Sequence, residues 1–159
     1  MSSSFDGLWV VVVNWNGGAE DNLRCLRSVL AEGVPAARIV FVDNASVDGS
    51  RDAVAAALPD LLHIDNGSNL GFGEGANQGA RHALTSGARA VAFVNNDLRF
   101  AEGGGVLRAL CAALDADERL GFVGPRVLFD DGSGRVWCAG GRQDHRQNVS
   151  TLLGNGASD

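Results

Sequence analysis

Short runs of apolar residues divide the chain at regular intervals. They occupy residues 8–13, 38–42, 61–64 and 90–94, and polar or glycine-containing stretches separate them. Each run is shorter than a typical helix, and the first is nearly all Val, as expected of a strand buried on both faces of a parallel sheet. We therefore predict four parallel strands at these positions.

The stretches between these strands have the residue spacing of helices. Apolar residues recur at helical intervals at Leu23, Leu26, Val29 and Leu30, at Ala80, Ala83 and Leu84, and at Val106, Leu107, Leu110 and Leu114. Pro35 ends the first predicted helix, and Pro59 ends an Ala-rich one. Strands that alternate with helices predict an α/β fold, a doubly wound and mostly parallel sheet with helices on both faces.

The pattern weakens toward the C-terminus. Residues 120–128 contain Gly124-Pro125, which predicts a bent or edge strand, and residues 135–138 are expected to return as a hairpin after a polar turn. Beyond this hairpin, no apolar pattern that would form a core is present. We predict one α/β domain over residues 1–141 and an irregular segment over residues 142–159.

Composition limits the chemistry of the 159-residue chain. Its net charge is −6 and its thirteen basic residues are all Arg, so we expect no nucleic-acid partner. Without Lys, no Schiff base can form. Cys25, Cys111 and Cys138 are widely spaced, which argues against a metal cluster or a disulfide framework. No signal peptide or apolar stretch of about 18 residues is found, which predicts a cytoplasmic chain without a membrane span.

Polar residues follow the predicted strands directly. Asn95-Asn96-Asp97 closes the run at 90–94, and Asp43 closes the run at 38–42. Right-handed crossovers place the loops that follow parallel strands at one rim of the sheet, where ligands bind in open α/β folds. A carboxylate there can hold a divalent cation on a phosphate group. The tripeptide therefore predicts a metal site, although a polar turn before a helix has the same composition.

Trp15 and the acidic residues of the second loop are candidates for nucleotide contact. Trp15 lies between two Asn residues, where its ring could stack on a nucleobase or pack over the end of the sheet. Asp43 could accept hydrogen bonds from a base or a ribose, and Asp48 is a second candidate. Either carboxylate could instead cap the next helix, as Ser50 could.

Residues 71–77 form a glycine-rich run before a predicted helix. Such a run can bring backbone N–H groups close to a phosphate, which makes Asn69, Gly71 and Asn77 candidate contacts. The run is not the dinucleotide fingerprint, which would follow the first strand, nor the Walker pattern, which needs Lys. Glycines here are also consistent with tight turns alone.

Four motifs occur together in one order along the chain. They are VVVNWNG at 11–17, VDNASVDGS at 42–50, NLGFGEGAN at 69–77 and VNND at 94–97. The set resembles the nucleotide-sugar-binding half of the family 2 glycosyltransferases with the GT-A fold, especially the rhamnosyltransferase-like branch. The resemblance runs from about residue 8 to about residue 141, and Gly124-Pro125-Arg126 fits that branch as well.

The resemblance implies a role for each candidate residue. Asp43 would bind a uracil or thymine base or its ribose, beside Trp15 and the backbone of Val13. Asp97 would coordinate Mg²⁺ or Mn²⁺ on the diphosphate of the donor. Asn95 stands where the family often has an acid, which removes one negative charge from the site. The remaining expected nucleotide contacts are Asp48, Asn69, Gly71, Asn77 and Asn96.

The reaction implied is an inverting transfer of rhamnose or a similar sugar in cell-wall or polysaccharide biosynthesis. The donor would be a UDP- or dTDP-sugar, and the acceptor a saccharide or a lipid-linked saccharide. In this branch an acidic pair with the presumed base lies well downstream of the metal-binding acid. Asp130, Asp131 and Asp144 do not stand in the matching context, and the chain ends at Asp159. We therefore expect a donor-binding part, truncated at its C-terminal side, without the general base.

Two other functions fit the same residues. A non-catalytic nucleotide-binding or interaction module, completed by a partner chain, needs no base. A nucleotidyltransferase shares the sheet architecture, but it should carry a basic, glycine-rich loop after the first strand, and residues 14–18 contain no basic residue. A missing acceptor half would also leave apolar surface uncovered, which predicts homo-oligomers through an exposed sheet edge.

Overall fold

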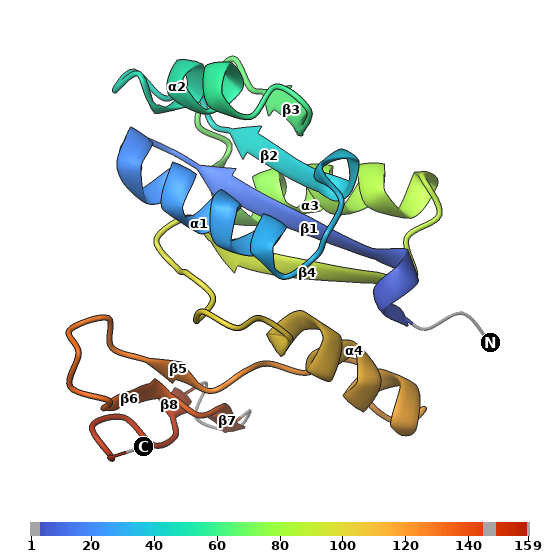
Figure 1. Ribbon diagram of the computed structural model, residues 1–159, viewed down its shortest axis with the longest axis vertical. Helices are drawn as coiled ribbons and strands as arrows, with labels where there is room; N and C mark the ends of the chain where they lie inside the picture. Colours follow the sequence, from blue (N-terminus) through green and yellow to red (C-terminus); the bar gives the residue numbers. More distant parts are fainter. Residues whose placement is uncertain (1–3, 145–148, 159) are drawn as a thin grey trace. The chain divides into compact units, whose positions relative to one another are not determined.

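The computed structural model describes residues 4–144 and 149–158 of the chain (Figure 1). Its contacts divide the chain into two compact units, residues 1–116 and residues 117–159. The first unit contains a parallel sheet and every α-helix of the described residues. The second unit contains short antiparallel strand pairs.

The sheet of the first unit has four parallel strands in the order β3-β2-β1-β4. They are β1 (Leu8–Asn14), β2 (Ile39–Asp43), β3 (Leu62–Asp65) and β4 (Ala90–Asn95). β1 lies in the middle, with Val13 paired to Val42 on one side and to Asn95 on the other. The four predicted strands are confirmed, each within one or two residues of the expected ends.

Helices cover both faces of this sheet, which confirms the doubly wound arrangement (Figure 1). The helices are α1 (Ala19–Ala31), α2 (Ser50–Ala57), α3 (Gly71–Thr85) and α4 (Val106–Ala116), with two 3-10 turns, η1 (Ser4–Gly7) and η2 (Ala36–Arg38). Residues of α1, α2 and α4 share one apolar core with Val10 and Val12 of β1. Ala83 of α3 shares the other core with Val11, because successive side chains of a strand point to opposite faces.

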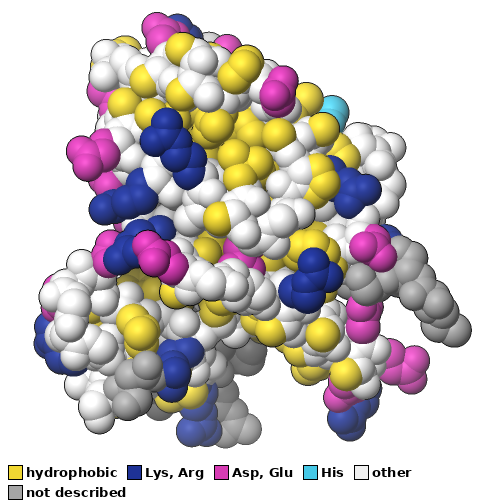
Figure 2. Space-filling view, in the orientation of Figure 1, with side chains coloured by type: hydrophobic (Ala, Val, Ile, Leu, Met, Phe, Trp, Pro, Cys, Tyr) yellow, Lys and Arg dark blue, Asp and Glu magenta, His cyan; other side chains and the backbone are white. Residues whose placement is uncertain are grey.

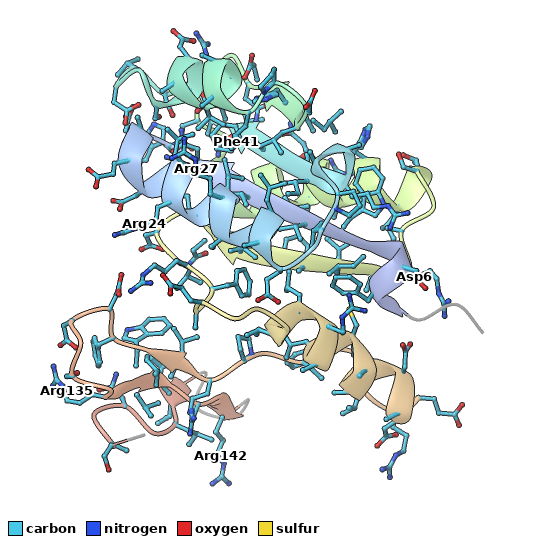
Figure 3. All side chains as sticks on the ribbon, viewed as in Figure 1. Asp6, Arg24, Arg27, Phe41, Arg135 and Arg142 are labelled. Atoms are coloured by element: carbon cyan, nitrogen blue, oxygen red, sulfur yellow. The ribbon has the colours of Figure 1, made fainter. Side chains whose placement is uncertain are left out.

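The larger core lies between the sheet and α1. Phe41 extends from β2 into this layer and is completely buried (Figure 3). Leu26 and Val29 of α1 are completely buried in the same cluster. They repeat at helical spacing, so the apolar stripe seen in the sequence is the face that packs on the sheet.

The glycine-rich run at residues 71–77 is helical, which corrects its prediction as a loop. Gly71 has a left-handed backbone, with φ 80°, and α3 begins at that residue. Farther along, a Cβ added to Gly79 would lie 2.5 Å from Cγ1 of Val11, so the helix rests directly on β1. The low helix propensity of glycine suggested a loop, but close packing on the sheet outweighs that preference.

A buried carboxylate marks the start of α4. Glu32, just after α1, is only 6% exposed, and its Oε2 accepts a hydrogen bond of 2.8 Å from the backbone N–H of Leu107. The helix predicted from the apolar spacing between Val106 and Leu114 begins at Val106, because Gly103, Gly104 and Gly105 before it all have positive φ. Glu32 therefore satisfies an otherwise unpaired donor in the first turn of α4.

We predict that Glu32→Ala destabilises the first unit by about 1 kcal/mol, as loss of a helix cap does. Glu102→Ala removes the same charge from the exposed segment before the same helix, so it should change stability by less than about 0.5 kcal/mol. Urea unfolding followed by the helical circular dichroism signal measures both. Equal effects of the two substitutions would contradict the capping role of Glu32.

The second unit consists of short strands that pair in two hairpin-like sets. β5 (Val127–Leu128) pairs antiparallel with β6 (Val136–Cys138), as the sequence predicted for residues 135–138. Only the last two residues of the strand predicted at 120–128 are in a strand, because Pro125 has no N–H to donate. β7 (Gly141–Asp144) pairs with β8 (Val149–Leu152), so the segment predicted as irregular contains regular structure. Backbone hydrogen bonds form such a pair without an apolar pattern.

The surface of the first unit is of mixed charge. On the face drawn in Figure 2, Arg side chains are interspersed with Asp and Glu side chains. Exposed ion pairs include Arg24 with Asp21 at 2.6 Å and Arg81 with Glu74 at 2.9 Å. Within the described ranges, no helix is long and apolar enough to cross a membrane. β4 forms one edge of the sheet, and Phe93 on it is 52% exposed, whereas self-association through this edge stays a prediction.

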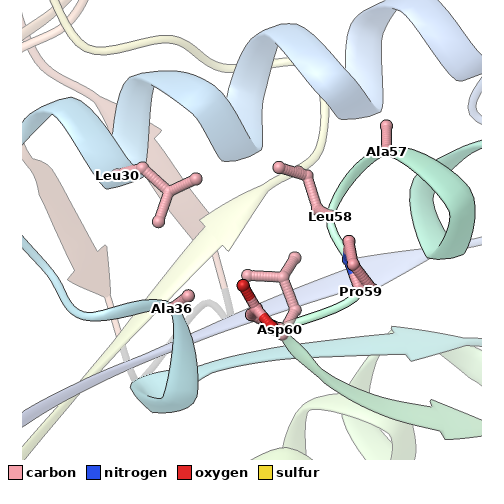
Figure 4. Close-up of a pocket in the computed structure, with 7 residues that line it drawn as sticks. Leu30, Ala36, Ala57, Leu58, Pro59 and Asp60 are labelled. Atoms are coloured by element: carbon pink, nitrogen blue, oxygen red, sulfur yellow. The ribbon is translucent and has the colours of Figure 1, made fainter.

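A small apolar hollow of about 130 Å³ lies beside the end of α1 (Figure 4). Leu30 and Ala36 line one part of it, and Leu58 and Leu61 line another. These residues precede β2 and β3, so the hollow lies at the amino ends of the strands. It is therefore at the opposite rim from the polar loops that follow the strands.

Candidate functional site

A buried amide, Asn14, lies at the centre of the polar rim. It is the last residue of β1 and has no exposed surface. Its Oδ1 accepts hydrogen bonds from the backbone N–H of Gly17 at 3.1 Å, from Asn22 Nδ2 at 2.9 Å and from Asn96 Nδ2 at 3.1 Å. The oxygen thereby connects the end of β1 to helix α1 and to the turn after β4.

The nitrogen of the same amide holds the loop after β2. Asn14 Nδ2 donates to Asp43 Oδ1 at 2.8 Å, to Ser46 Oγ at 3.0 Å and to Ser50 Oγ at 2.8 Å. A carboxylate can only accept and a backbone N–H can only donate, so Asp43 and Gly17 fix which end of the amide is oxygen. Sequence reasoning did not select Asn14, although its place at the end of a buried apolar run is the same signal that selected Asp43.

Asp43 has no exposed surface in the free chain. Its Oδ1 accepts from Asn14, and its Oδ2 accepts from the backbone N–H of Ser46 at 2.8 Å. A buried carboxylate needs such partners, because an unpaired charge inside a protein is costly. The arrangement makes Asp43 a support of the 43–50 loop, and its predicted contact with a base is not tested by this geometry.

Asp48 is exposed, and it joins two loops. Its Oδ2 accepts from the backbone N–H of Gly18 at 2.9 Å, and its Oδ1 accepts from the N–H of Ser50 at 3.0 Å and from the Ser50 hydroxyl at 2.5 Å. These hydrogen bonds, the Ser50 hydroxyl first, lower the pKa of Asp48 below its ordinary value. The carboxylate is therefore engaged just before α2, whose N-cap residue is Gly49 and has no side-chain capping hydrogen bond.

The loops after β1 and β2 are also tied through Asn16. Its backbone N–H donates to Ser46 Oγ at 2.9 Å, and its Oδ1 accepts from the N–H of Val47 at 2.8 Å. Asn16 and Ala45 both adopt left-handed backbone, with φ of 51° and 60°. Such conformations outside glycine are uncommon and concentrate at functional loops. The backbone on either side of Trp15 is consequently held in place.

Trp15 and Asp97 are both exposed at the rim. Trp15 is 58% exposed, so its ring does not pack away over the end of the sheet. Asp97 is exposed and directly follows Asn96, whose amide donates to Asn14. Since β1 and β4 are neighbours in the sheet, the two groups follow adjacent strand ends. Val13 is half-buried and paired on both sides, so its backbone lies within the sheet.

The candidates at the start of α3 lie near a second set of amides. Asn69 Oδ1 accepts from the backbone N–H of Gly71 at 2.8 Å and so occupies a donor at the helix start. The buried Asn44 donates to the Gly71 carbonyl at 3.1 Å, which ties the end of β2 to this helix. Asn77 is exposed on the second turn of α3.

A divalent cation fits the rim only if the protein and a bound phosphate group share its coordination. Within the parts of the chain that the structure describes, no three His, Cys, Asp or Glu side chains are grouped as a metal site. Mg²⁺ is commonly bound by one or two carboxylates together with phosphate oxygens of the substrate. The exposed carboxylate of Asp97 is suited to that role and not to a cage built by the protein alone.

The buried thiol of Cys25, near this rim, is unreactive. Cys25 is completely buried in α1 and donates to the carbonyl of Asn95 at 3.4 Å. Burial, followed by the charge of Asp97, raises the pKa of Cys25 to about 12. The thiol therefore stays protonated near neutral pH and serves packing, not nucleophilic chemistry.

Comparison with known proteins gives one family and several similar folds. The family model described as glycosyl transferase family 2 matches residues 9–154. The mannosyltransferase PcManGT from Pyrobaculum calidifontis, solved in complex with GDP-Man and Mn²⁺, is 24% identical, with a TM-score of 0.56, over 70% of this chain and 32% of that one. TarS from S. aureus is 20% identical, with a TM-score of 0.53, over 81% of this chain and 41% of that one.

TarS has also been solved in complex with UDP-GlcNAc, and that structure matches with 20% identity and a TM-score of 0.51 over 78% of this chain and 38% of that one. No curated protein matches the chain. The chain thus spans less than half the length of each of these structures. At these identities the likeness shows a common fold.

Proposed function

The chain belongs to glycosyl transferase family 2, and from this premise we propose that it binds the nucleotide-sugar donor of an inverting sugar transfer. The GT-A fold predicted from the sequence is confirmed by the parallel sheet and the similar structures. The proposed donor is a UDP- or dTDP-sugar, with rhamnose or a similar sugar. The proposed acceptor is a saccharide or a lipid-linked saccharide, in the cytoplasm.

One observation carries this proposal: an exposed aromatic ring and an exposed carboxylate follow adjacent strand ends. Trp15 follows β1 and Asp97 follows β4, and the residues just before them, Asn14 and Asn96, are joined by a hydrogen bond. A nucleoside diphosphate presents a flat base and an anionic diphosphate, which are suited to a ring and to a metal-binding acid respectively.

Asp97 would hold the divalent cation together with oxygens of the donor diphosphate. When bound, a metal ion supplies positive charge that stabilises the departing nucleoside diphosphate. Asn95, where the family often has an acid, leaves the rim with less negative charge than a pair of carboxylates would. We therefore expect Mn²⁺ or Mg²⁺ to bind chiefly in the presence of the diphosphate.

The remaining predicted nucleotide contacts differ in whether the loop that carries them has to move. Asp48, Asn69, Gly71, Asn77 and Asn96 are the remaining proposed nucleotide contacts. A contact of Asp43 with the base requires the 43–50 loop to move, since that carboxylate has no exposed surface. We propose that the backbone of Val13 contacts the base at the carboxyl end of β1. We assign no general base.

Calorimetric titration of the 159-residue chain with UDP, dTDP, GDP and their sugars, with and without Mn²⁺, tests the proposal. GDP-Man and UDP-GlcNAc belong in the set because structures with similar folds were solved with them. We expect tighter binding of at least one nucleotide when Mn²⁺ is present. Absence of any metal-dependent nucleotide binding would refute the proposal.

A non-catalytic nucleotide-binding module is the second candidate. The observation that favours it is that Asp97 is the one carboxylate of the turn after β4, flanked by the amides of Asn95 and Asn96. Sugar transfer from a bound donor to an acceptor by this chain would exclude it. Nucleotide binding with neither transfer nor donor hydrolysis would support it.

We predict that Trp15→Ala weakens nucleotide binding about tenfold, toward the lower end of the roughly 1–3 kcal/mol typical of stacking on a base. Trp15→Phe should restore most of the loss, because a ring remains on a loop that Asn16 and Ser46 hold in place. The effect should be equal with and without Mn²⁺, since the ring does not touch the metal. Unchanged affinity in Trp15→Ala would place the base elsewhere.

A further inference from the structure

The end of β1 lies between the two halves of the proposed donor site. β1 pairs with β2 on one side and with β4 on the other. The loop after β2 carries Asp43 and Asp48, and the turn after β4 carries Asn96 and Asp97. Any rigid connection between these two polar segments has to pass the residue that ends β1, which is Asn14.

The side chain of Asn14 makes that connection with its two ends. Nδ2 bonds to Asp43, Ser46 and Ser50, which belong to the loop after β2, and Oδ1 bonds to Asn96 in the turn after β4. The amide is completely buried and its orientation is fixed by its partners. Water therefore does not compete for these hydrogen bonds, and a shift of either segment breaks at least one of them.

Gly17 leaves the space in which the amides of Asn14 and Asn96 meet. A Cβ added to Gly17 would lie 2.0 Å from Asn96 Nδ2 and 2.8 Å from Asn14 Oδ1. Both distances are far below van der Waals contact, so Ala at this position would push the Asn96 amide away. The backbone of Gly17 donates to Asn14 Oδ1 in the same place, which holds the glycine against the pair.

We propose that Asn14 is a positioning residue that sets the metal-binding carboxylate of Asp97 through Asn96. This proposal rests on the donor-binding function and deepens it, because it states how the metal side of the site is held relative to the base side. Asn14 touches neither metal nor nucleotide. Its amide fixes Asn96, and Asn96 fixes the backbone position from which Asp97 extends.

The test compares nucleotide affinity with and without Mn²⁺ in Gly17→Ala. Groups that orient a metal ligand typically contribute about 10- to 100-fold to metal affinity, so we expect the gain in UDP affinity from Mn²⁺ to fall about tenfold. The affinity for UDP without metal should fall by less than the gain from Mn²⁺ does, because Trp15 is untouched and only the proposed contact of Asn96 is displaced. Gly79→Ala is the control: it clashes with Val11 in the core, far from the rim, and should keep the full gain from Mn²⁺.

A double-mutant cycle with Asn96→Ala separates positioning from direct nucleotide contact. Each single substitution breaks the same hydrogen bond, so Gly17→Ala combined with Asn96→Ala should be no worse than either alone. Additive losses of the gain from Mn²⁺ would mean that Asn96 acts on the metal side independently of its hydrogen bond to Asn14, and would overturn the proposal. Asn14→Ala, if it folds, should match Asn96→Ala in the loss of the Mn²⁺ effect.

The outcomes distinguish this proposal from the function on which it rests. If the unmodified chain shows no Mn²⁺-dependent binding, the donor-binding function fails and this proposal fails with it. If the unmodified chain binds with Mn²⁺ and Gly17→Ala keeps the full gain, only the positioning role of Asn14 is overturned. A parallel loss in Gly79→Ala would also overturn it, since general destabilisation would then explain the effect.

Discussion

Asp97→Ala should abolish the Mn²⁺-dependent part of nucleotide binding while leaving the metal-free affinity almost unchanged. Asp97 is the exposed carboxylate that we propose as the metal ligand, and without it the cation would be held by the diphosphate alone. We expect a loss of at least about 100-fold, above the roughly 10- to 100-fold typical of groups that only orient a metal ligand. Calorimetric titration of UDP or dTDP with and without Mn²⁺ measures the loss.

Two variants make this result specific to the position. Asp97→Asn keeps an oxygen but removes the charge, so its loss should lie between those of the unmodified chain and Asp97→Ala. Asp60→Asn removes the same charge from the opposite rim, where Asp60 is exposed before β3, and should keep the full effect of Mn²⁺. A full Mn²⁺ effect in Asp97→Ala would refute the metal assignment.

Gly79→Ala should destabilise the first unit by about 2 kcal/mol, because it inserts a methyl group where α3 rests on β1. The new Cβ would lie 2.5 Å from Cγ1 and 2.9 Å from Cγ2 of Val11, which is 1% exposed. Val is β-branched and has few alternative rotamers, so the helix itself has to shift. The better helix propensity of Ala offsets only about 1 kcal/mol of that cost.

A matched glycine in the same helix provides the control. Nothing lies within 4 Å of a Cβ added to Gly73, so Gly73→Ala should be neutral or stabilising by up to about 1 kcal/mol. Val11→Ala removes the two methyl groups that clash, so Gly79→Ala should cost less in that background. Urea unfolding followed at the helical circular dichroism band compares the three single variants and the double variant with the unmodified chain. Equal effects at Gly73 and Gly79 would contradict close packing of α3 on β1.

The glycine-rich run shows where a local pattern was insufficient. The sequence of residues 71–77 suggested a phosphate loop, because several glycines precede a helical stretch. The structure places these residues inside α3, where Gly75 and Gly79 face β1 and only Gly71 needs a left-handed backbone. A glycine that permits a turn and a glycine that permits close packing look the same in a sequence. They differ in which residues pack against them in the folded protein.

The two carboxylates at strand ends also show that a local sequence pattern does not predict burial. Asp43 and Asp97 each follow an apolar run, and the sequence predicted both as ligand contacts, Asp43 for a base or ribose and Asp97 for a metal. In the structure Asp43 is buried and bonded to Asn14 and Ser46, while Asp97 is exposed. The burial of Asp43 depends on the loop folded over it, and no local pattern contains that information.

The sequence alone determined the parallel sheet, the helices on its two faces and the rim on which the polar residues gather. Those features follow from apolar periodicity, which is read within a few neighbouring residues. Only the tertiary structure decided which polar groups face each other. Asn14 and Asn96 are 82 residues apart in the chain, and they meet because β1 and β4 pair in one register. Hydrogen bonding between loops depends on that register, which is a property of the folded sheet and not of any one segment.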